Sequence, residues 1–372
     1  MYNYTTINAG IKRKVMSFCG KLTKGVKKPT EKFITQMIFG IMAAKSLHLS
    51  KIARALKEDT HLNQTINRLS INLENSDLSS VYDNYLETLK PSVNNDTLFI
   101  IDDTEIIKPR GTSFEALGYV RDGSSSTRKL EKGYHACEIV MVGDNKQPKS
   151  VYSHIYSELE RGFESSNRET FKGLDKTINA FGNVGTYILD RGFDADKYYE
   201  YFIKEQVDFI IRSKKNRKVI YKGKKRSIGY VVNNYKGRVN MTIMFQNEAV
   251  DVRVSHAKIR LSCSKENLYL VVVHGLGKNP FKLITNKQIN SRKDVIKVVL
   301  KYLSRWRVEE YFKFKKQSFN FEDFRVRKLS SIRNINLLLS LTTSFISDLV
   351  KVSEEETVLA INIKSVSRGL KE

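Results

Sequence analysis

A stretch near the carboxyl end of the chain combines one carboxylate with several side chains that bind phosphate. Residues 302–316 read YLSRWRVEEYFKFKK, and this run without Gly or Pro predicts one long helix. At about 100° per residue, a strip of that helix about 80° wide carries Tyr302, Arg305, Glu309, Lys313 and Lys316. Such a strip suits nucleic-acid chemistry, because its cations bind phosphates beside an acid. The alternative is a charged helix face that is only solvated.

Carboxylates also interrupt two apolar segments. Residues 97–106, TLFIIDDTEI, read as a strand buried on both faces that is broken by Asp102 and Asp103. Residues 187–194, YILDRGFD, give a second apolar strand that ends at Asp190. A buried aspartate must be paired, hydrogen-bonded or metal-bound, although one of the first two could merely cap the next turn. If the two strands are neighbours in a sheet, their acids lie together.

The composition favours polyanionic partners. The 372 residues include 64 Lys and Arg against 40 Asp and Glu, which gives a formal charge of +24. Such an excess favours nucleic acid, and it makes binding salt-dependent. An anionic membrane is the other candidate, but no apolar run reaches the roughly 20 residues of a spanning helix. We therefore expect DNA as the partner, with no membrane and no small-molecule substrate.

Cysteine usage and the first residues favour a cytoplasmic location. The cysteines Cys19, Cys137 and Cys263 are far apart and odd in number, which indicates a reducing compartment without a disulfide framework. They do not combine with the six histidines at a zinc-ligand spacing. Lys and Arg recur through the first 30 residues, so we expect no signal peptide.

The first 95 residues predict a helical region. Residues 1–30 are basic and are expected to form a mobile arm. Apolar periodicity then predicts helices near residues 31–41, 49–56, 63–69 and 77–91. The third of these turns Gln64, Asn67 and Arg68 outward, and such side chains pair with base edges in a major groove. This favours a helix-turn-helix, although any small helical bundle gives similar spacing.

The remaining chain predicts an α/β unit with an interruption. Residues 96–212 give the order three strands, helix, strand, helix, strand. Alternating segments in residues 213–285 predict a mostly β insertion, after which the α/β unit resumes at 286–328 and a helical segment follows at 329–372. Residues 209–247 hold eleven basic residues and no acidic one, including Lys214, Lys215, Lys224 and Lys225. They indicate either a patch that tracks a DNA backbone or a strand edge protected by lysines.

Taken together, these features resemble the ribonuclease-H-like catalytic domain of DDE transposases. The spacing within residues 302–316 is similar to the Y-(2)-R-(3)-E-(6)-K signature of bacterial cut-and-paste insertion-sequence transposases of the IS-four type. Asp103 followed by Thr resembles the first D-T motif of that family, and Asp190 followed by Arg191 resembles its second, D-R. The resemblance covers nearly the whole chain, and the helices before residue 96 look like the family's DNA-binding region.

The resemblance implies a metal-dependent enzyme that acts on DNA. Asp103, Asp190 and Glu309 would hold two Mg²⁺ or Mn²⁺ ions, with Asp102 and Glu310 as the rivals for the first and third positions. Asp103 is preferred because the family's acid directly precedes a Thr. Residues that bind DNA would be Tyr302, Arg305, Lys313, Lys316, Arg191, Gln64, Asn67, Arg68, Lys214, Lys215, Lys224 and Lys225.

Three functions remain open at this stage. An active transposase would bind the terminal inverted repeats of its own element, cleave them and join them to target DNA, as a homodimer in a bacterial nucleoid. A domesticated or inactive relative would bind specific DNA without cleavage, and another nuclease of the superfamily would cleave without joining. Hairpin-forming relatives stack a base on a Trp of the insertion, but the only Trp of this chain is Trp306, in the signature helix.

Overall fold

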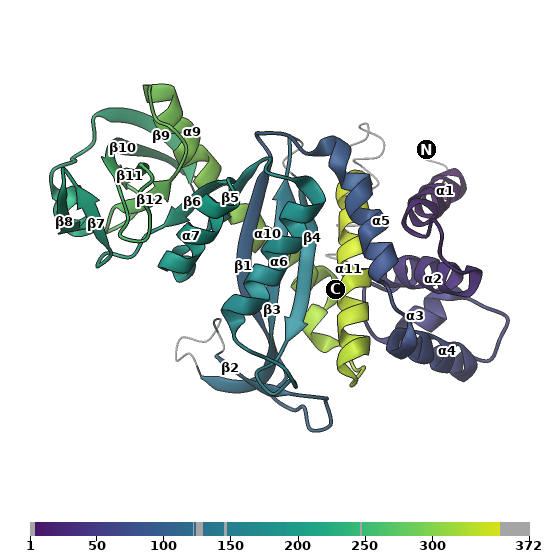
Figure 1. Cartoon of the computed structure of the whole chain (residues 1–372). Helices are drawn as coiled ribbons and strands as arrows, with labels where there is room; N and C mark the ends of the chain where they lie inside the picture. The colour runs from purple at the N-terminus through teal and green to yellow at the C-terminus, as the bar shows by residue number, and fades with distance from the viewer. Residues whose placement is uncertain (1–3, 122, 124–128, 145–146, 246–247, 350–372) are drawn as a thin grey trace.

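The core of the molecule is one large mixed sheet with helices on both faces (Figure 1). The computed structural model describes residues 4–121, 123, 129–144, 147–245 and 248–349. The strands of the sheet are β1 (Leu98–Ile107), β2 (Gly118–Arg121), β3 (Leu130–Val142), β4 (Pro148–Tyr156), β5 (Thr186–Leu189), β6 (Asp208–Arg212), β9 (Val239–Phe245), β10 (Glu248–Ile259), β11 (Leu268–His274) and β12 (Phe281–Thr285). A separate hairpin is formed by β7 (Lys218–Tyr221) and β8 (Lys224–Ser227).

Helices form the rest of the described fold. They are α1 (Tyr4–Leu22), α2 (Lys28–Ala44), α3 (Leu49–Leu56), α4 (Leu62–Asn75), α5 (Ser79–Leu89), α6 (Ser166–Phe181), α7 (Asp196–Lys204), α8 (Ile228–Asn233), α9 (Arg292–Leu303), α10 (Trp306–Phe319) and α11 (Leu329–Leu349). The predicted helices before residue 96 are thus confirmed, but the expected mobile arm is wrong, because α1 occupies most of it. Within the described residues, no helix is long and apolar enough to cross a bilayer.

Strand β1 is apolar on both faces because helices cover both faces of the sheet. Leu98 and Ile100 join the core beneath α9 and α10, whereas Phe99 and Ile101 join the core beneath α6 and α7. Strand β5 runs parallel to β1, with Ile101 opposite Leu189. The prediction that the two acid-ended strands are neighbours is therefore confirmed.

The β-rich residues 213–285 continue the same sheet. Strand β12 pairs antiparallel with β6, and β11, β10 and β9 follow outward from it. The sheet order is β2-β3-β1-β5-β6-β12-β11-β10-β9, and β4 also pairs with β3. The segment is mostly β, as predicted, but β9 to β12 extend the main sheet, whereas β7 and β8 form the separate hairpin. The division of the chain into domains stays a prediction, and residues 350–372 of the predicted carboxyl-terminal segment lie outside the described residues.

The signature stretch is two helices, not the single helix that the sequence predicted. Helix α9 ends at Leu303 and α10 begins at Trp306. Between them the backbone tightens into i to i−3 bonds, from the Arg305 amide to the Tyr302 carbonyl at 3.0 Å and from the Val308 amide to the Arg305 carbonyl at 3.0 Å. The side chains expected on one helix are therefore divided between α9, which carries Tyr302, and α10, which carries Glu309, Lys313 and Lys316.

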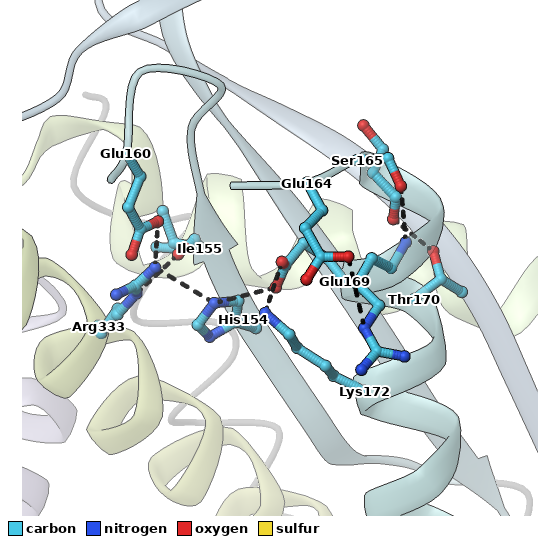
Figure 2. Close-up of polar contacts among 11 residues, drawn as sticks. His154, Ile155, Glu160, Glu164, Ser165, Glu169, Thr170, Lys172 and Arg333 are labelled. Atoms are coloured by element: carbon cyan, nitrogen blue, oxygen red, sulfur yellow. Dashed lines mark hydrogen bonds and ion pairs between the residues drawn. The ribbon is translucent and has the colours of Figure 1, made fainter. Parts of the chain in front are cut away.

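Helix α11 lies between the sheet and the amino-terminal helices, against β4 on one side and α2 and α4 on the other (Figure 1). A polar network fixes it to β4 (Figure 2). Arg333 of α11 donates to the Ile155 carbonyl at 2.9 Å and to Glu160 at 2.6 Å, and it lies 3.2 Å from His154. His154 in turn lies 3.6 Å from Glu169 of α6. The network ties α6, β4 and α11 together.

Candidate active site

Three carboxylates lie near one another beneath the junction of α9 and α10, where β5 ends beside the middle of β1. The Arg305 guanidinium contacts Asp102 at 3.3 Å and Glu309 at 2.7 Å. The Tyr302 hydroxyl donates to Asp190 at 3.2 Å. Because Ile101 is opposite Leu189 in the parallel pair, Asp102 in the middle of β1 is the neighbour of Asp190, which directly follows β5. The structure therefore brings together one acid from each strand and one from the helix.

The first of these acids is Asp102 and not Asp103. Side chains alternate along a strand, so Asp102 shares the α10 face with Leu98 and Ile100. Asp103 points to the opposite face, where its carboxylate bonds with Cys137. The sequence preference for Asp103 rested on the following Thr and does not agree with this geometry. Glu310 also points elsewhere and pairs with Arg307 at 2.9 Å.

Burial and neighbouring charges shift the pKa values of the cluster. Burial raises the pKa of the Asp102 carboxyl to about 7. The Arg305 guanidinium opposes that rise, while the carboxylates of Asp103, Asp190 and Glu309 add to it. Burial and the charge of Asp190 raise the pKa of the Tyr302 hydroxyl, which therefore stays protonated and acts as a donor. The site thus favours additional cations.

The donor set fits a hard cation, but the side chains are held apart by Arg305. Carboxylate oxygens are the ligands that Mg²⁺ and Mn²⁺ prefer. Among the described residues, no three His, Cys, Asp or Glu side chains are close enough to hold an ion together. The expectation that Glu309 lies within shared-metal reach of both aspartates is therefore not met, because Arg305 links Glu309 to Asp102 instead.

A basic pocket adjoins Asp190. It measures about 150 Å³, and the cations that line it are Arg191, Arg212, Lys215 and Lys282. The Arg212 guanidinium lies 3.8 Å from Asp190 and stacks on the Phe281 ring at 3.9 Å. Burial and the neighbouring cations lower the pKa of Lys282. Sequence reasoning singled out Arg191 and Lys215 but missed Arg212 and Lys282, which lie on β6 and β12 on the same side of the site.

The other predicted DNA contacts are spread over the surface. Lys313, Lys214, Lys224 and Lys225 are exposed, whereas Lys316 bonds with Glu322 at 3.0 Å. On α4, Gln64 and Asn67 are exposed. The exception is Arg68, which bonds with Gln36 at 2.7 Å and Glu58 at 2.5 Å. Two side chains of the helical region therefore hold Arg68, although its side chain remains 36% exposed, and its contact with DNA stays a prediction.

Sequence reasoning also missed a buried ion pair beneath the site. Lys315 of α10 bonds with Glu138 of β3 at 2.5 Å, and neither side chain is exposed to solvent. The sequence position of Lys315 could have indicated its burial, because Lys315 falls on the same face of α10 as the buried residues Val308, Tyr311 and Phe319. Trp306, in contrast, is 43% exposed and contacts Phe245 at a ring distance of 6.4 Å.

Carboxylates at strand ends inside a cationic surface are typical of enzymes that cleave or transfer phosphodiesters. The chain belongs to the family described as "Transposase DDE domain", whose model matches residues 94–345. Among solved structures it is similar to a piggyBac transposase synaptic complex with hairpin DNA, determined by cryo-EM. The two are 11% identical with a TM-score of 0.47, over 96% of this chain and 77% of that one. No curated protein matches.

Proposed function

We propose that the chain is a cut-and-paste transposase of the IS-four type. It would bind the terminal inverted repeats of its own element, hydrolyse the phosphodiester at each end and join the ends to target DNA. The observation that carries the proposal is the strand register, because it brings Asp102 of β1 beside Asp190 of β5 while Arg305 links Asp102 to Glu309. Residues 302–316 supply Glu309 at the signature spacing.

The sheet topology supports a ribonuclease-H-like catalytic domain. Strands β1, β3 and β4 are antiparallel, and β5 and β6 then follow in parallel on the other side of β1. Residues 96–212 and 286–328 would form this domain, and residues 1–95 would form the DNA-binding domain. In that domain Gln64 and Asn67 would contact base edges, because α4 exposes both of them.

We propose Asp102, Asp190 and Glu309 as the ligands of two Mg²⁺ or Mn²⁺ ions. When bound, such ions activate the attacking oxygen and stabilise the leaving oxygen. Arg305 neutralises Asp102 and Glu309 in the structure described, so it would move toward a DNA phosphate when the ligands converge. Tyr302 orients Asp190 through its protonated hydroxyl. Arg191, Lys215 and the other cations of the 150 Å³ pocket would hold the DNA backbone beside Asp190.

Nicking of a duplex that carries the terminal repeat tests the function and the ligands together. The repeat is identified as the inverted sequence that flanks the gene. Asp190→Asn and Glu309→Gln should bind this duplex but lose at least about 1,000-fold of the Mg²⁺-dependent nicking rate, which corresponds to about 4 kcal/mol. If these variants cut as fast as the wild type, the proposed function is wrong.

A pair of adjacent substitutions tests the choice of the first ligand. Asp102→Asn should abolish nicking to the same extent as Asp190→Asn, because both carboxylates face the site. Asp103→Asn should retain nicking within about tenfold, because its side chain lies on the other face of the sheet. The reverse result would restore Asp103 as the ligand. A strand-transfer assay with a pre-cut 3′ end then separates a transposase from a nuclease that does not join ends.

Synapsis of two DNA ends would require two copies of the chain, so we propose a homodimer on DNA within a bacterial nucleoid. The retained acids and the surrounding cations support an active enzyme over a domesticated DNA-binding protein. Sedimentation of the chain with and without the terminal-repeat duplex measures the number of copies bound.

A further inference from the structure

A second basic pocket lies where the amino-terminal helices meet the connection between α10 and α11 (Figure 1). It measures about 390 Å³. One wall is formed by the start of α3 and the carboxyl-terminal half of α4, and the other by residues 325–328 and the first turn of α11. The pocket shares no lining residue with the 150 Å³ pocket beside Asp190, so it is a separate feature of the surface.

Three cations line this pocket without a counter-ion. Arg325, Arg327 and Lys328 are exposed, and none of the described carboxylates forms an ion pair with them. One acid, Glu74, shares the lining, so the pocket keeps a net positive charge. Guanidinium and ammonium groups bind phosphate oxygens through charged hydrogen bonds. The pocket therefore favours an anion that offers several acceptor oxygens.

The backbone that carries these cations is held on both sides. The Glu115 amide donates to the Arg327 carbonyl at 3.0 Å, and the Glu115 carboxylate accepts from the Leu329 amide at 2.8 Å. Toward the amino-terminal helices, the His48 imidazole lies 2.8 Å from the Asp323 carboxylate. An anion in the pocket would therefore order side chains without having to order a loop, which lowers the cost of binding.

Helix α4 leads from the proposed base-reading residues to the pocket. Asn67 is exposed on α4, and Ser70, which lines the pocket, follows three residues later. Three residues of helix rise about 4.5 Å and return to nearly the same face. A phosphate at the border of a major groove lies about 6 Å from the groove centre, because the groove is about 12 Å wide. The pocket is therefore placed to meet the backbone that borders the bases contacted by α4.

We infer that this pocket holds one backbone phosphate of the terminal-repeat duplex, at the border of the groove that α4 reads. Arg325, Arg327 and Lys328 neutralise the phosphate, and the Ser70 hydroxyl supplies a further donor. The inference rests on the proposed function in one respect, which is that α4 contacts the terminal repeat. It deepens that function, because the same phosphate would join α4 to the segment that follows the signature helices.

Binding of the terminal-repeat duplex to the full-length chain tests this inference. The Asp190→Asn variant is used throughout, so that cleavage does not interfere. Replacing Arg325, Arg327 and Lys328 together by Gln in this background should raise the dissociation constant at least about tenfold. It should also reduce the slope of log affinity against log salt by about 0.9, the value for one phosphate. Lys204→Gln is the matched control, since Lys204 is exposed on α7 and does not line the pocket.

A substitution of the opposite sign separates a phosphate site from a loss of folding. Glu74→Gln should lower the dissociation constant by about two- to fivefold, because it removes the acid among the described lining residues. Ethylation interference then locates the phosphate. Ethylation of one phosphate in the repeat should weaken binding by the Asp190→Asn chain and should have no effect on the triple Gln variant.

An unchanged dissociation constant and salt slope in the triple Gln variant would overturn the inference. Inorganic phosphate, compared with chloride at equal ionic strength, should leave duplex binding within about twofold. If inorganic phosphate weakens binding as much as the triple substitution does, the pocket is a free-anion site and the assignment to DNA is wrong. A chain that needs these cations for binding but never nicks the repeat would refute the proposed enzyme alone. Nicking by a chain whose binding ignores them would refute the pocket alone.

Discussion

Two neighbouring ion pairs join the signature helices to the sheet, and their carboxylates lie opposite each other on the adjacent strands β1 and β3. Asp102 is opposite Glu138 in the antiparallel pair, and Arg305 contacts the first while Lys315 contacts the second. Lys315 and Glu138 are completely buried. In the other pair, the Arg305 side chain is 16% exposed and that of Asp102 is 23% exposed. Adjacent positions in one sheet therefore carry two very different ion pairs.

The buried pair has neutral hydrogen-bond partners besides its own two ions, whereas in the half-buried pair one cation is shared between two carboxylates. Glu138 also accepts from Ser153 at 2.6 Å, and Lys315 also donates to Asn336 at 3.1 Å. Burial alone would lower the pKa of Lys315, but Glu138 raises it above its usual value, so the pair stays charged. At the other site one guanidinium faces Asp102 and Glu309 together. The first pair fixes α10 on the sheet, and under the proposed function the second would exchange its cation for a metal ion.

The largest expected effect is on folding stability, at the buried pair. Lys315→Met should lower the free energy of unfolding by about 3–5 kcal/mol, because it leaves the Glu138 carboxylate buried without its cation. Urea denaturation measures the change. Lys313→Met is the matched control on the same helix, and it should stay within about 0.5 kcal/mol, because Lys313 is exposed. Equal losses in the two variants would show that the pair contributes nothing specific.

A smaller effect, with a different response to metal, is expected at Arg305. Arg305→Gln should destabilise the metal-free chain by about 1.5–3 kcal/mol, because Asp102 and Glu309 lose their charged donor. Added Mg²⁺ should then raise the melting temperature of this variant more than that of the wild type, since no guanidinium competes for the carboxylates. Arg307→Gln, whose partner is the exposed Glu310, should show neither effect. A larger Mg²⁺ shift in the wild type would contradict a shared metal site.

A third cation, Arg68 on α4, separates folding from DNA recognition. Arg68→Ala should cost about 1–2 kcal/mol of stability, because Glu58 and Gln36 lose a partner in a half-exposed pair. Gln64→Ala should leave stability unchanged and should weaken binding to the terminal repeat by about 1–3 kcal/mol. Denaturation and electrophoretic mobility shift measure the two quantities. If Gln64→Ala binds the repeat normally, α4 does not read base edges.

The adjacency of β1 and β5 could be predicted, because each is an apolar run followed by an acid and such a run is visible in the local sequence. It did not identify which of Asp102 and Asp103 faces the site, since a shift of one residue inverts the face and only the register to β5 decides it. The break before Trp306 could not be predicted, because the residues there include no Gly or Pro and helix propensity therefore indicated one continuous helix. Arg68 was predicted to face DNA and Lys315 was assigned no role, because a lysine or arginine gives no local sign of a distant carboxylate partner.

The smallest expected effect is on the pH dependence of stability. It arises at His154, whose imidazole lies beside Arg333 in the network of Figure 2 and is neutral in the folded chain. Burial, aided by the charges of Arg333 and Lys172, lowers the pKa of His154 to about 3. Its pKa in the unfolded chain is about 6.5, so the unfolded chain takes up the proton first as pH falls. The contribution of His154 to the free energy of unfolding is therefore fully present above about pH 6.5 and is lost progressively below it, by about 1 kcal/mol between pH 6 and 5.

His154→Gln should remove this slope, while His61→Gln, at an exposed position, should retain it. Urea denaturation at the two pH values measures the difference, and an unchanged slope in His154→Gln would mean that the histidine is charged in the folded chain.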